Sequence, residues 1–213
     1  MTSRRIGAPD AKNRVVLLDA AEQLLLAEGY AAVTSRRVAD QAGLKPQLVH
    51  YYFRTMEDLF LAVFRRRAEE GLTVLTTALQ SPQPLWALWR FSTAPEATRL
   101  TMEFMGLANH RKALRAEIVY YAERFREAQN QAIAEALHRH GAEDDTGVPP
   151  VVWTVFATAV SQAIVMERAL GMSTGHDETF EFCEQWLRQL EGEPLPETAA
   201  AFGDGGVALR SGQ

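Results

Sequence analysis

A stretch near the N-terminus holds basic and aromatic side chains of the types that contact DNA, gathered on the second of two short helical patterns. In that second pattern Val49 and Phe53 are four residues apart and are expected to point inward. Gln47, His50 and Tyr51 are then left on the other faces, where such side chains can reach base edges or phosphates. This is the layout of a helix that contacts a DNA groove.

Local signals place a first helix and a tight turn before this one. Thr34 has a side-chain oxygen that can cap a helix running through about Gln41. Gly43 stands where a left-handed residue ends that helix, and Pro46 fits the first turn of the next, where a missing amide hydrogen costs little. The pattern predicts a helix-turn-helix. Taken alone, it is equally typical of helical proteins that never touch nucleic acid.

The rest of the chain also has helical patterns, with no strand pattern and no internal repeat. A first helix is expected from Pro9 to Glu28, and Thr55–Asp58 predicts the capped start of a fourth helix. Residues 151–166 are apolar at twelve of sixteen positions, nearly all round a helix. Because a membrane span needs roughly 20 such residues, we expect this helix to be buried on two sides instead.

Three consecutive arginines, Arg65–Arg67, suggest a basic patch at first sight. Successive helical residues are rotated by about 100°, so these three side chains spread around the helix and cannot face one partner. The sequence therefore predicts a solvated surface at this point rather than a DNA contact.

The charge is unevenly distributed along the 213 residues. Residues 1–67 hold 11 Lys+Arg against 7 Asp+Glu, whereas residues 68–213 hold 11 against 20. A positive end with an acidic remainder suits a protein that presents one end to phosphate. The single cysteine, Cys183, excludes an internal disulfide and fits a reducing cytosol, so a cytoplasmic location is expected.

The sequence lacks the common motifs of catalysis. It has no HExxH, no CxxC, no phosphate-binding glycine loop and no nucleophile elbow. His138 and His140 diverge by about 200° on a helix and cannot share a metal ion. We therefore expect no enzyme activity, no metal and no cofactor. An all-α interaction protein, or a constitutive DNA binder without a ligand, is the alternative to a ligand-controlled regulator.

Four segments together resemble the DNA-binding domain of the tetracycline-repressor (TetR) family of bacterial transcription regulators. They are LLDAAEQLLLAEGY at 17–30, TSRRVADQAGL at 34–44, LVHYYF at 48–53 and TMEDLF at 55–60. The resemblance implies an all-α fold of about nine helices. It implies a homodimer that binds a palindromic DNA operator and is released by a small effector, most simply as a repressor.

The same resemblance implies the division of the chain and the residues that contact DNA. The N-terminal DNA-binding domain would cover residues 1–54, a helical regulatory and dimerisation domain 55–191, and a flexible tail 192–213. The positions that match the family's DNA contacts are Thr34, Ser35, Arg36, Lys45, Pro46, Gln47, Leu48, His50, Tyr51, Tyr52 and Arg54.

Three positions depart from the family pattern. Leu48 stands where a small hydroxyl residue is usual, and His50 where a tyrosine is usual. Met56 replaces a lysine that commonly anchors phosphate, so Arg54 is expected to supply that charge. The operator sequence is therefore not transferable from the family.

The resemblance also implies where an effector and a second subunit would bind. Aromatic and apolar residues of the enclosing helices suggest a hydrophobic or aromatic effector, with pocket residues Trp86, Trp89, Phe104, Met105, His110, Tyr121, Phe125, Trp153 and Phe156. The last two helices would pair between subunits through Val152, Val155, Ala159, Ala163, Phe180, Cys183, Trp186 and Leu187. The sequence specifies neither the effector, nor the regulated genes, nor whether a second dimer joins on DNA.

Overall fold

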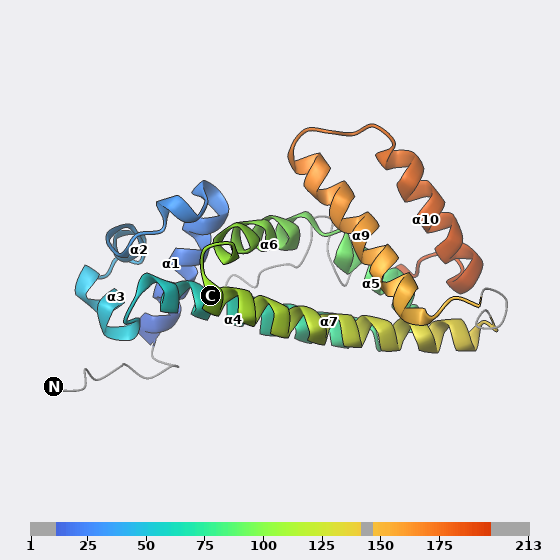
Figure 1. Ribbon diagram of the computed structural model, residues 1–213, viewed down its shortest axis with the longest axis horizontal. Helices are drawn as coiled ribbons and strands as arrows, with labels where there is room; N and C mark the ends of the chain where they lie inside the picture. Colours follow the sequence, from blue (N-terminus) through green and yellow to red (C-terminus); the bar gives the residue numbers. More distant parts are fainter. Residues whose placement is uncertain (1–11, 142–146, 197–213) are drawn as a thin grey trace. The chain divides into compact units, whose positions relative to one another are not determined.

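The computed structural model describes residues 12–141 and 147–196, which contain nine α-helices, one short 3-10 helix and no strand (Figure 1). The predicted all-α class of about nine helices is confirmed. The predicted start of the first helix at Pro9, and the predicted tail from residue 197 on, lie outside the described residues. The elements are α1 (Lys12–Glu28), η1 (Tyr30–Ala32), α2 (Ser35–Gln41), α3 (Pro46–Tyr52), α4 (Met56–Ala78), α5 (Pro84–Ser92), α6 (Pro95–Ala108), α7 (Lys112–Arg139), α9 (Pro150–Ala169) and α10 (His176–Glu191).

The chain packs as two compact units. Unit 1 comprises the chain up to Glu70 together with Leu100–Tyr121, and unit 2 comprises Gly71–Arg99 together with the chain from Ala122. The helices α4, α6 and α7 each have residues in both units. The domain boundary predicted between residues 54 and 55 stays a prediction, because these units are defined by packing and not by function.

Unit 1 is built on one apolar core to which α1, α2, α3, α4, α6 and α7 all contribute. Val49 of α3 is fully buried there, as its predicted inward position requires, and so is Val38 of α2. Phe64 of α4 lies edge-on to Phe104 of α6 and to Tyr121 of α7, with ring centroids 5.1 and 5.7 Å away. This core fixes α2 and α3 against the longer helices.

The arginine triplet Arg65–Arg67 ties helices of unit 1 together. Arg66 binds Asp19 at 2.6 Å and Glu22 at 2.8 Å on α1, and Arg67 binds Glu22 at 3.2 Å. The side chains of Arg66 and Arg67 are only 22% and 15% exposed, so the prediction of a solvated surface was wrong for both. The divergence of the three side chains was predicted correctly, since Arg65 turns to Glu117 of α7 instead.

Unit 2 has its own apolar core, centred on α5 and closed by α10. The end of α10 holds the start of α5: the backbone amides of Leu85 and Trp86 donate to the carboxylate of Glu191 at 3.1 Å. The Gln83 side chain donates to the carbonyls of Glu191 at 2.9 Å and Glu193 at 2.7 Å. The bonds to the Glu191 carboxylate satisfy backbone amides that the first turn of a helix otherwise leaves without partners.

Replacing Glu191 by alanine is expected to destabilise the fold by about 2 kcal/mol, because two amides at the start of α5 lose their acceptor. Burial raises the pKa of Glu191 above its ordinary value, and this outweighs the two amide hydrogen bonds. A neutral glutamine at this position keeps an acceptor oxygen, so Glu191→Gln is the matched control and should lose much less. Urea unfolding followed by circular dichroism measures both. Equal losses in the two variants would contradict a capping role.

Candidate nucleic-acid interface and apolar pocket

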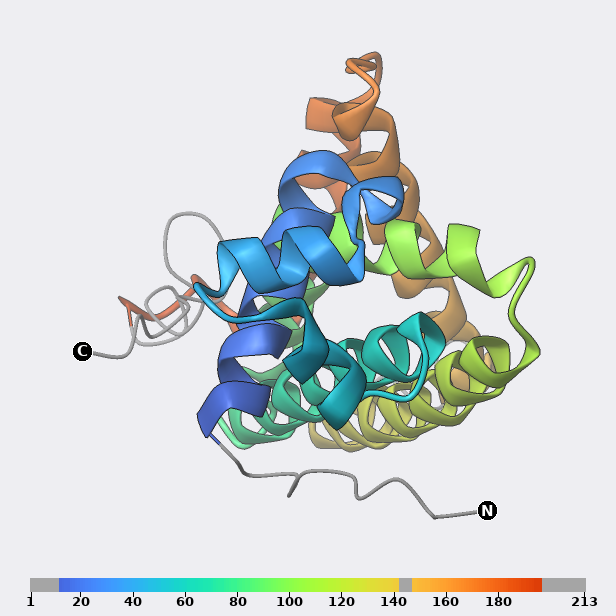
Figure 2. The ribbon, with the colours of Figure 1, turned by 90° about the vertical axis from the view of Figure 1, so that its left-hand side faces the viewer.

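The two short helices of unit 1 form a helix-turn-helix (Figure 2). Thr34 caps α2, and its hydroxyl accepts a hydrogen bond from the backbone amide of Arg37 at 3.3 Å. In the turn, Gly43 has φ +64°, and the backbone amide of Leu44 donates a hydrogen bond to the carbonyl of Ala39 at 2.9 Å. Pro46 is the first residue of α3. Each local signal predicted for this motif is confirmed.

Replacing Gly43 by alanine is expected to destabilise unit 1 by about 1 to 2 kcal/mol, because a Cβ disfavours the left-handed region. No atom lies within 4 Å of the position that this Cβ would occupy, so the cost comes from the backbone alone. Gly106, in the interior of α6, has equally open surroundings, so Gly106→Ala is the control and should be neutral or stabilising. Thermal unfolding of both variants tests this. A stable Gly43→Ala protein would show that the turn can change shape.

The residues predicted to contact DNA lie on the surface of α2, α3 and the segment after α3. Eight of the eleven are exposed: Thr34, Arg36, Lys45, Pro46, Gln47, His50, Tyr51 and Arg54. Ser35 is half-buried, and Leu48 and Tyr52 are half-buried against the core of unit 1. The structure therefore gathers a polar and basic outer face on α3, with Leu48 and Tyr52 at its inner edge.

Two neighbouring arginines of α2 differ in what they bind. The two terminal guanidinium nitrogens of Arg37 donate to the carboxylate of Glu28, at 2.9 and 2.6 Å, and these hydrogen bonds raise the pKa of Arg37. Arg36 is 86% exposed and has only a long contact of 4.0 Å to Asp40. Arg36 is therefore the arginine of this pair that can turn to a base edge.

The start of α4 places Met56 and Arg54 differently. The hydroxyl of Thr55 accepts from the amide of Asp58 at 3.0 Å, and the Asp58 carboxylate accepts from the amide of Thr55 at 3.1 Å. The predicted capping arrangement is confirmed. Met56 packs against the core of unit 1, whereas Arg54 is exposed. The exposed cation at this place is therefore Arg54.

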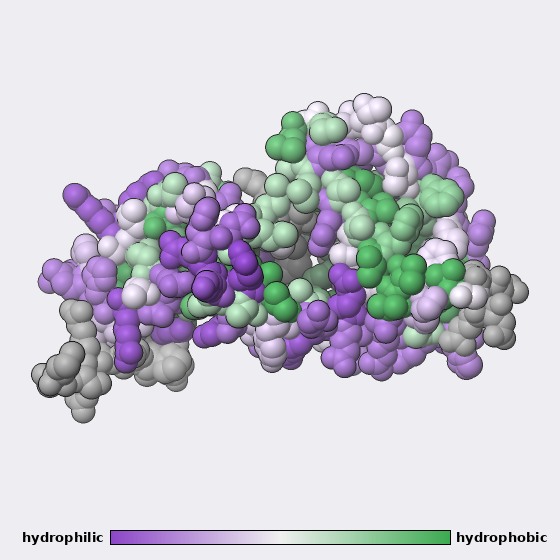
Figure 3. Space-filling model, viewed as in Figure 1, coloured by the Kyte–Doolittle hydropathy of each residue, from purple (hydrophilic) through white to green (hydrophobic). Residues whose placement is uncertain are grey.

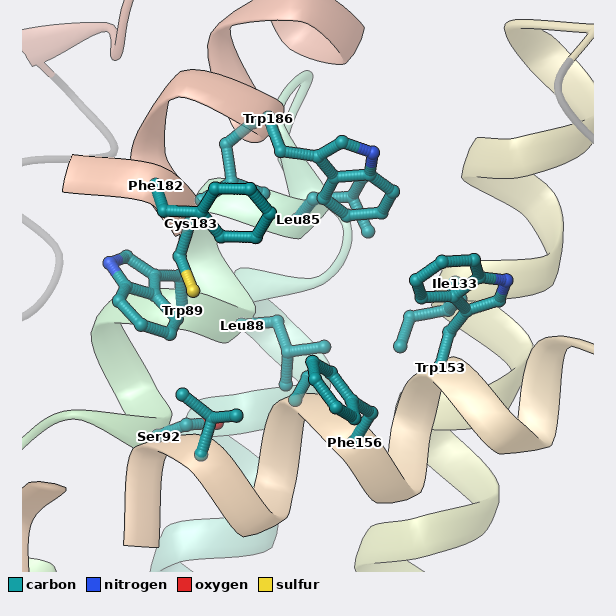
Figure 4. A pocket seen from close by; sticks show the side chains of 13 residues that line it. Leu85, Leu88, Trp89, Ser92, Ile133, Trp153, Phe156, Phe182, Cys183 and Trp186 are labelled. Carbon is teal, nitrogen blue, oxygen red and sulfur yellow. The ribbon is translucent and has the colours of Figure 1, made fainter. Parts of the chain in front are cut away.

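A cavity of about 190 Å³ lies within unit 2 (Figure 4). We call it the apolar pocket. It lies among α5, α7, α9 and α10, and its lining residues are Leu85, Leu88, Trp89, Ser92, Ile133, Trp153, Phe156, Ala157, Val160, Phe182, Cys183, Trp186 and Leu187. No charged side chain is among them, and burial raises the pKa of the Cys183 thiol, which keeps it neutral near pH 7. The lining suits an uncharged guest.

Only part of the predicted effector site lies at this pocket. Trp89, Trp153 and Phe156 line it, while Trp86 is buried in the neighbouring core and Phe125 stacks on Phe91 at 6.0 Å. The other four belong to unit 1: Phe104 is buried in its core, the Tyr121 hydroxyl donates to Glu69 at 2.7 Å, and Met105 and His110 are exposed.

The helix α10 supplies pocket residues that the sequence did not suggest. Cys183, Trp186 and Leu187 were expected at a dimer interface, and Phe182 was not singled out. The rings of Trp153 and Trp186 stack at 5.6 Å, which joins α9 to α10 beside the pocket. The pocket residues of α10 are spaced one and four residues apart, which predicts an apolar face on this helix. The spacing does not predict whether that face packs inside the chain or against a partner.

The predicted interface residues of α9, unlike most of those of α10, do not line the pocket. Val152, Val155, Ala159 and Ala163 are all exposed, and they recur at three and four residues along one face. The buried side of α9 is mixed, with Thr154 and Ser161 beside Ile164 and Val165. Thr154 contacts Asn130 and Thr158 contacts Gln129 of α7, both at 3.4 Å. Figure 3 shows hydrophobic side chains gathered on the surface of unit 2. Within one chain, α9 thus leaves a row of apolar residues exposed.

Comparison with known proteins agrees with the helix-turn-helix. Residues 17–63 match the family described as bacterial regulatory proteins, tetR family. Over 122 residues the chain is 30% identical to the HTH-type transcriptional regulator BetI of Rhizobium meliloti (strain 1021). That match covers 53% of this chain and 60% of the relative, so it spans less than two thirds of the relative's length.

Solved structures share the fold over most of the chain. A TetR transcription regulator from Haloarcula marismortui superposes with a TM-score of 0.67 at 19% identity, over 84% of this chain and 96% of that one. A transcriptional regulator from Saccharomonospora viridis in complex with choline has a TM-score of 0.67 at 13% identity, over 83% and 93%. The regulator FadR from Bacillus subtilis in complex with stearoyl-CoA has a TM-score of 0.62 at 14% identity, over 84% and 99%.

The fold and the exposed α3 define an all-α protein of the helix-turn-helix DNA-binding class. Within that class, residues 17–63 match the bacterial regulatory proteins of the tetR family, and the chain shares the fold of a solved TetR transcription regulator.

Proposed function

We propose that this protein is a ligand-responsive repressor that binds a palindromic operator as a homodimer and leaves it when a small apolar effector binds. The observation that carries the proposal is the outer face of α3. Lys45, Gln47, His50 and Tyr51 are exposed together there, on a helix whose inner face is held by the buried Val49. A rigid helix that presents such side chains fits the major groove.

Arg36 and Gln47 contact base edges, because both are exposed and both can make two hydrogen bonds to one base. Lys45 and Arg54 contact phosphates, where a cation needs no particular base. The half-buried Tyr52 packs below the phosphate backbone, since its ring belongs partly to the core.

The second copy binds through α9. Its exposed valines, together with Phe156, Met166 and Leu170, leave a large apolar surface that a second identical helix can cover. By length and composition α9 is also the one described helix that passes as a membrane span. Its buried Thr154 and Ser161 fit contact with α7 better than contact with lipid. A two-fold dimer presents two reading helices to successive turns of DNA, about 34 Å apart or more.

The effector binds in the apolar pocket. Its volume of about 190 Å³ exceeds the roughly 150 Å³ of an engineered apolar cavity that binds benzene, so a molecule of one or two rings fits. A buried cation gains about 2 kcal/mol from each aromatic face but loses more on desolvation where no carboxylate is near. We therefore favour an uncharged guest, although one protein of the same fold was solved with choline.

Selection of DNA from a random pool by the purified chain tests this function. The proposal predicts an inverted repeat whose half-sites are separated by about one helical turn. An enriched single half-site would mean that the chain acts as a monomer. Addition of a neutral aromatic compound should release the selected DNA. Specific DNA binding that no such compound changes would indicate a constitutive DNA binder, and no enrichment at all would indicate an interaction protein.

A further inference from the structure

One wall of the apolar pocket carries a hydroxyl group among apolar side chains. The helix α5 lines the pocket with Leu85, Leu88, Trp89 and Ser92. These residues recur at i, i+3, i+4 and i+7, so they share one face of the helix. Ser92 is the last residue of α5, about 10 Å along the helix axis from Leu85. Its hydroxyl therefore lies at one end of this wall, and Figure 4 shows Ser92 at the end of the pocket opposite Trp186.

The Ser92 hydroxyl can form hydrogen bonds that the chain does not use. Its neighbour Thr93 donates to the carbonyl of Trp89 at 2.8 Å, as a hydroxyl near the end of a helix commonly does. The Ser92 side chain makes no such bond with any residue that the structure describes. A hydroxyl can donate one hydrogen bond and accept two. Its partner is therefore the molecule that fills this end of the pocket, which is water or a guest.

The other polar atoms of the lining are less suited to bind a guest. Figure 4 shows the indole nitrogens of Trp89, Trp153 and Trp186 on ring edges that face away from the middle of the pocket. The nitrogen of Trp153 is buried and has no partner among the described residues, yet it lies on such an outer edge. The Cys183 thiol is a weak donor and a weak acceptor. Ser92 is thus the strongest hydrogen-bonding group that the described lining residues offer to a guest.

We propose that Ser92 selects the effector, and that the pocket takes neutral aromatic molecules that carry a single hydroxyl group. The ring of the guest lies among the apolar walls, and its hydroxyl bonds Ser92. This inference rests on the proposed effector site and adds the chemical class of the effector. A hydrocarbon ring of the same size displaces water from Ser92 and leaves its hydroxyl without a partner.

The same placement disfavours guests with a second polar group. A substituent on the opposite side of the ring lies towards Leu85, which is buried and apolar. A hydroxyl there loses its water and finds no replacement, and a carboxylate loses far more. The arrangement therefore prefers a phenol to a hydrocarbon, to a diol and to an aromatic acid.

The test compares two probes of nearly equal size on the full-length chain. Phenol and toluene differ in one hydroxyl against one methyl group, and both are uncharged at pH 7. Each is titrated against the wild type and Ser92→Ala, with binding followed by the shifts of backbone amide signals in NMR spectra. Ser81→Ala, which removes a hydroxyl of unit 2 outside the pocket, is the matched control. Trp153→Phe removes the unpaired indole N–H and keeps an aromatic ring.

We expect Ser92→Ala to weaken phenol binding about five- to tenfold and to change the dissociation constant of toluene by less than about twofold. Each probe is compared with itself between proteins, so the different affinities of phenol and toluene for water cancel. Ser81→Ala and Trp153→Phe should leave the ratio of the two dissociation constants as it is in the wild type.

Three results would overturn the inference. If Ser92→Ala changed neither probe, or changed both equally, Ser92 would not select the effector, and the proposed effector site would stand. If Trp153→Phe and not Ser92→Ala lowered the affinity for phenol alone, the indole nitrogen would be the anchor. If neither probe bound the wild type, the proposed effector site itself would be refuted.

Discussion

Replacing Val155 by glutamate is expected to lower the affinity of the chain for its operator by about a hundredfold or more. Two linked half-site contacts gain roughly 10² to 10⁴ over one through their high effective concentration, and a monomer loses that gain. Val155 is exposed on α9, and its outward position means that the single chain folds without it. A buried pair of glutamates facing one another across a two-fold axis is costly, so the dimer dissociates.

Fluorescence anisotropy with labelled operator DNA at fixed salt measures this loss. The Val119→Glu protein carries the same substitution at an exposed valine of unit 1 and should bind the operator nearly as the wild type does. Circular dichroism of both variants confirms that the helices are intact. If Val155→Glu bound as tightly as the wild type, α9 would not be the dimer face.

Removing either of the side chains that we propose contact bases, by Arg36→Ala or Gln47→Ala, is expected to weaken specific binding by about 1 to 3 kcal/mol. Both residues are exposed and neither supports the core, so the free energy of unfolding should change little. Each variant should lose affinity for the operator but not for random DNA, because non-specific affinity comes from phosphate contacts. Each should also discriminate less between bases at one position of the operator.

Arg37→Ala is the matched control for Arg36→Ala. Its guanidinium pairs with Glu28 on an exposed surface, where solvent screens the interaction, so its loss should change the free energy of unfolding little. We expect it to leave base discrimination unchanged. Competition binding with operators altered at single positions provides the measurement. If Arg36→Ala kept the wild-type base preference and Arg37→Ala lost it, Arg37 and not Arg36 would be the residue that contacts a base.

The helix-turn-helix was predictable because its determinants are local. A capping oxygen at Thr34, a left-handed glycine at Gly43 and a proline at the start of α3 each act within one turn of the backbone. The inward side chains Val38 and Val49 follow from helical periodicity. None of these requires knowledge of what packs against the motif from elsewhere in the chain.

The pocket was only partly predictable because it depends on which way each helix turns. The α10 residues Cys183, Trp186 and Leu187 form an apolar face that could pack inside its own chain or against another, and in the structure they line the pocket. Phe104 shares the periodicity of a pocket residue but is buried in the core of unit 1. Periodicity identifies a face and does not identify its neighbour.

Ion pairs were equally hard to predict, because they join positions far apart in the sequence. Arg66 and Arg67 looked like solvated cations, yet Glu22, more than forty residues earlier, pairs with both and is itself buried. The helix α9 was expected to be buried on two sides, on one by its own chain and on the other by something else. The chain itself covers one side, and the exposed side is where we propose that the second subunit packs.

The most direct test of the proposed function is a gel shift with the purified full-length chain on DNA from immediately upstream of its own gene, in an excess of random competitor DNA at physiological salt. We expect one discrete complex with two chains per duplex, an affinity at least about a thousandfold above that for random DNA, and release by a neutral aromatic compound. Equal affinity for the upstream region and random DNA, with no operator recovered by selection either, would contradict it.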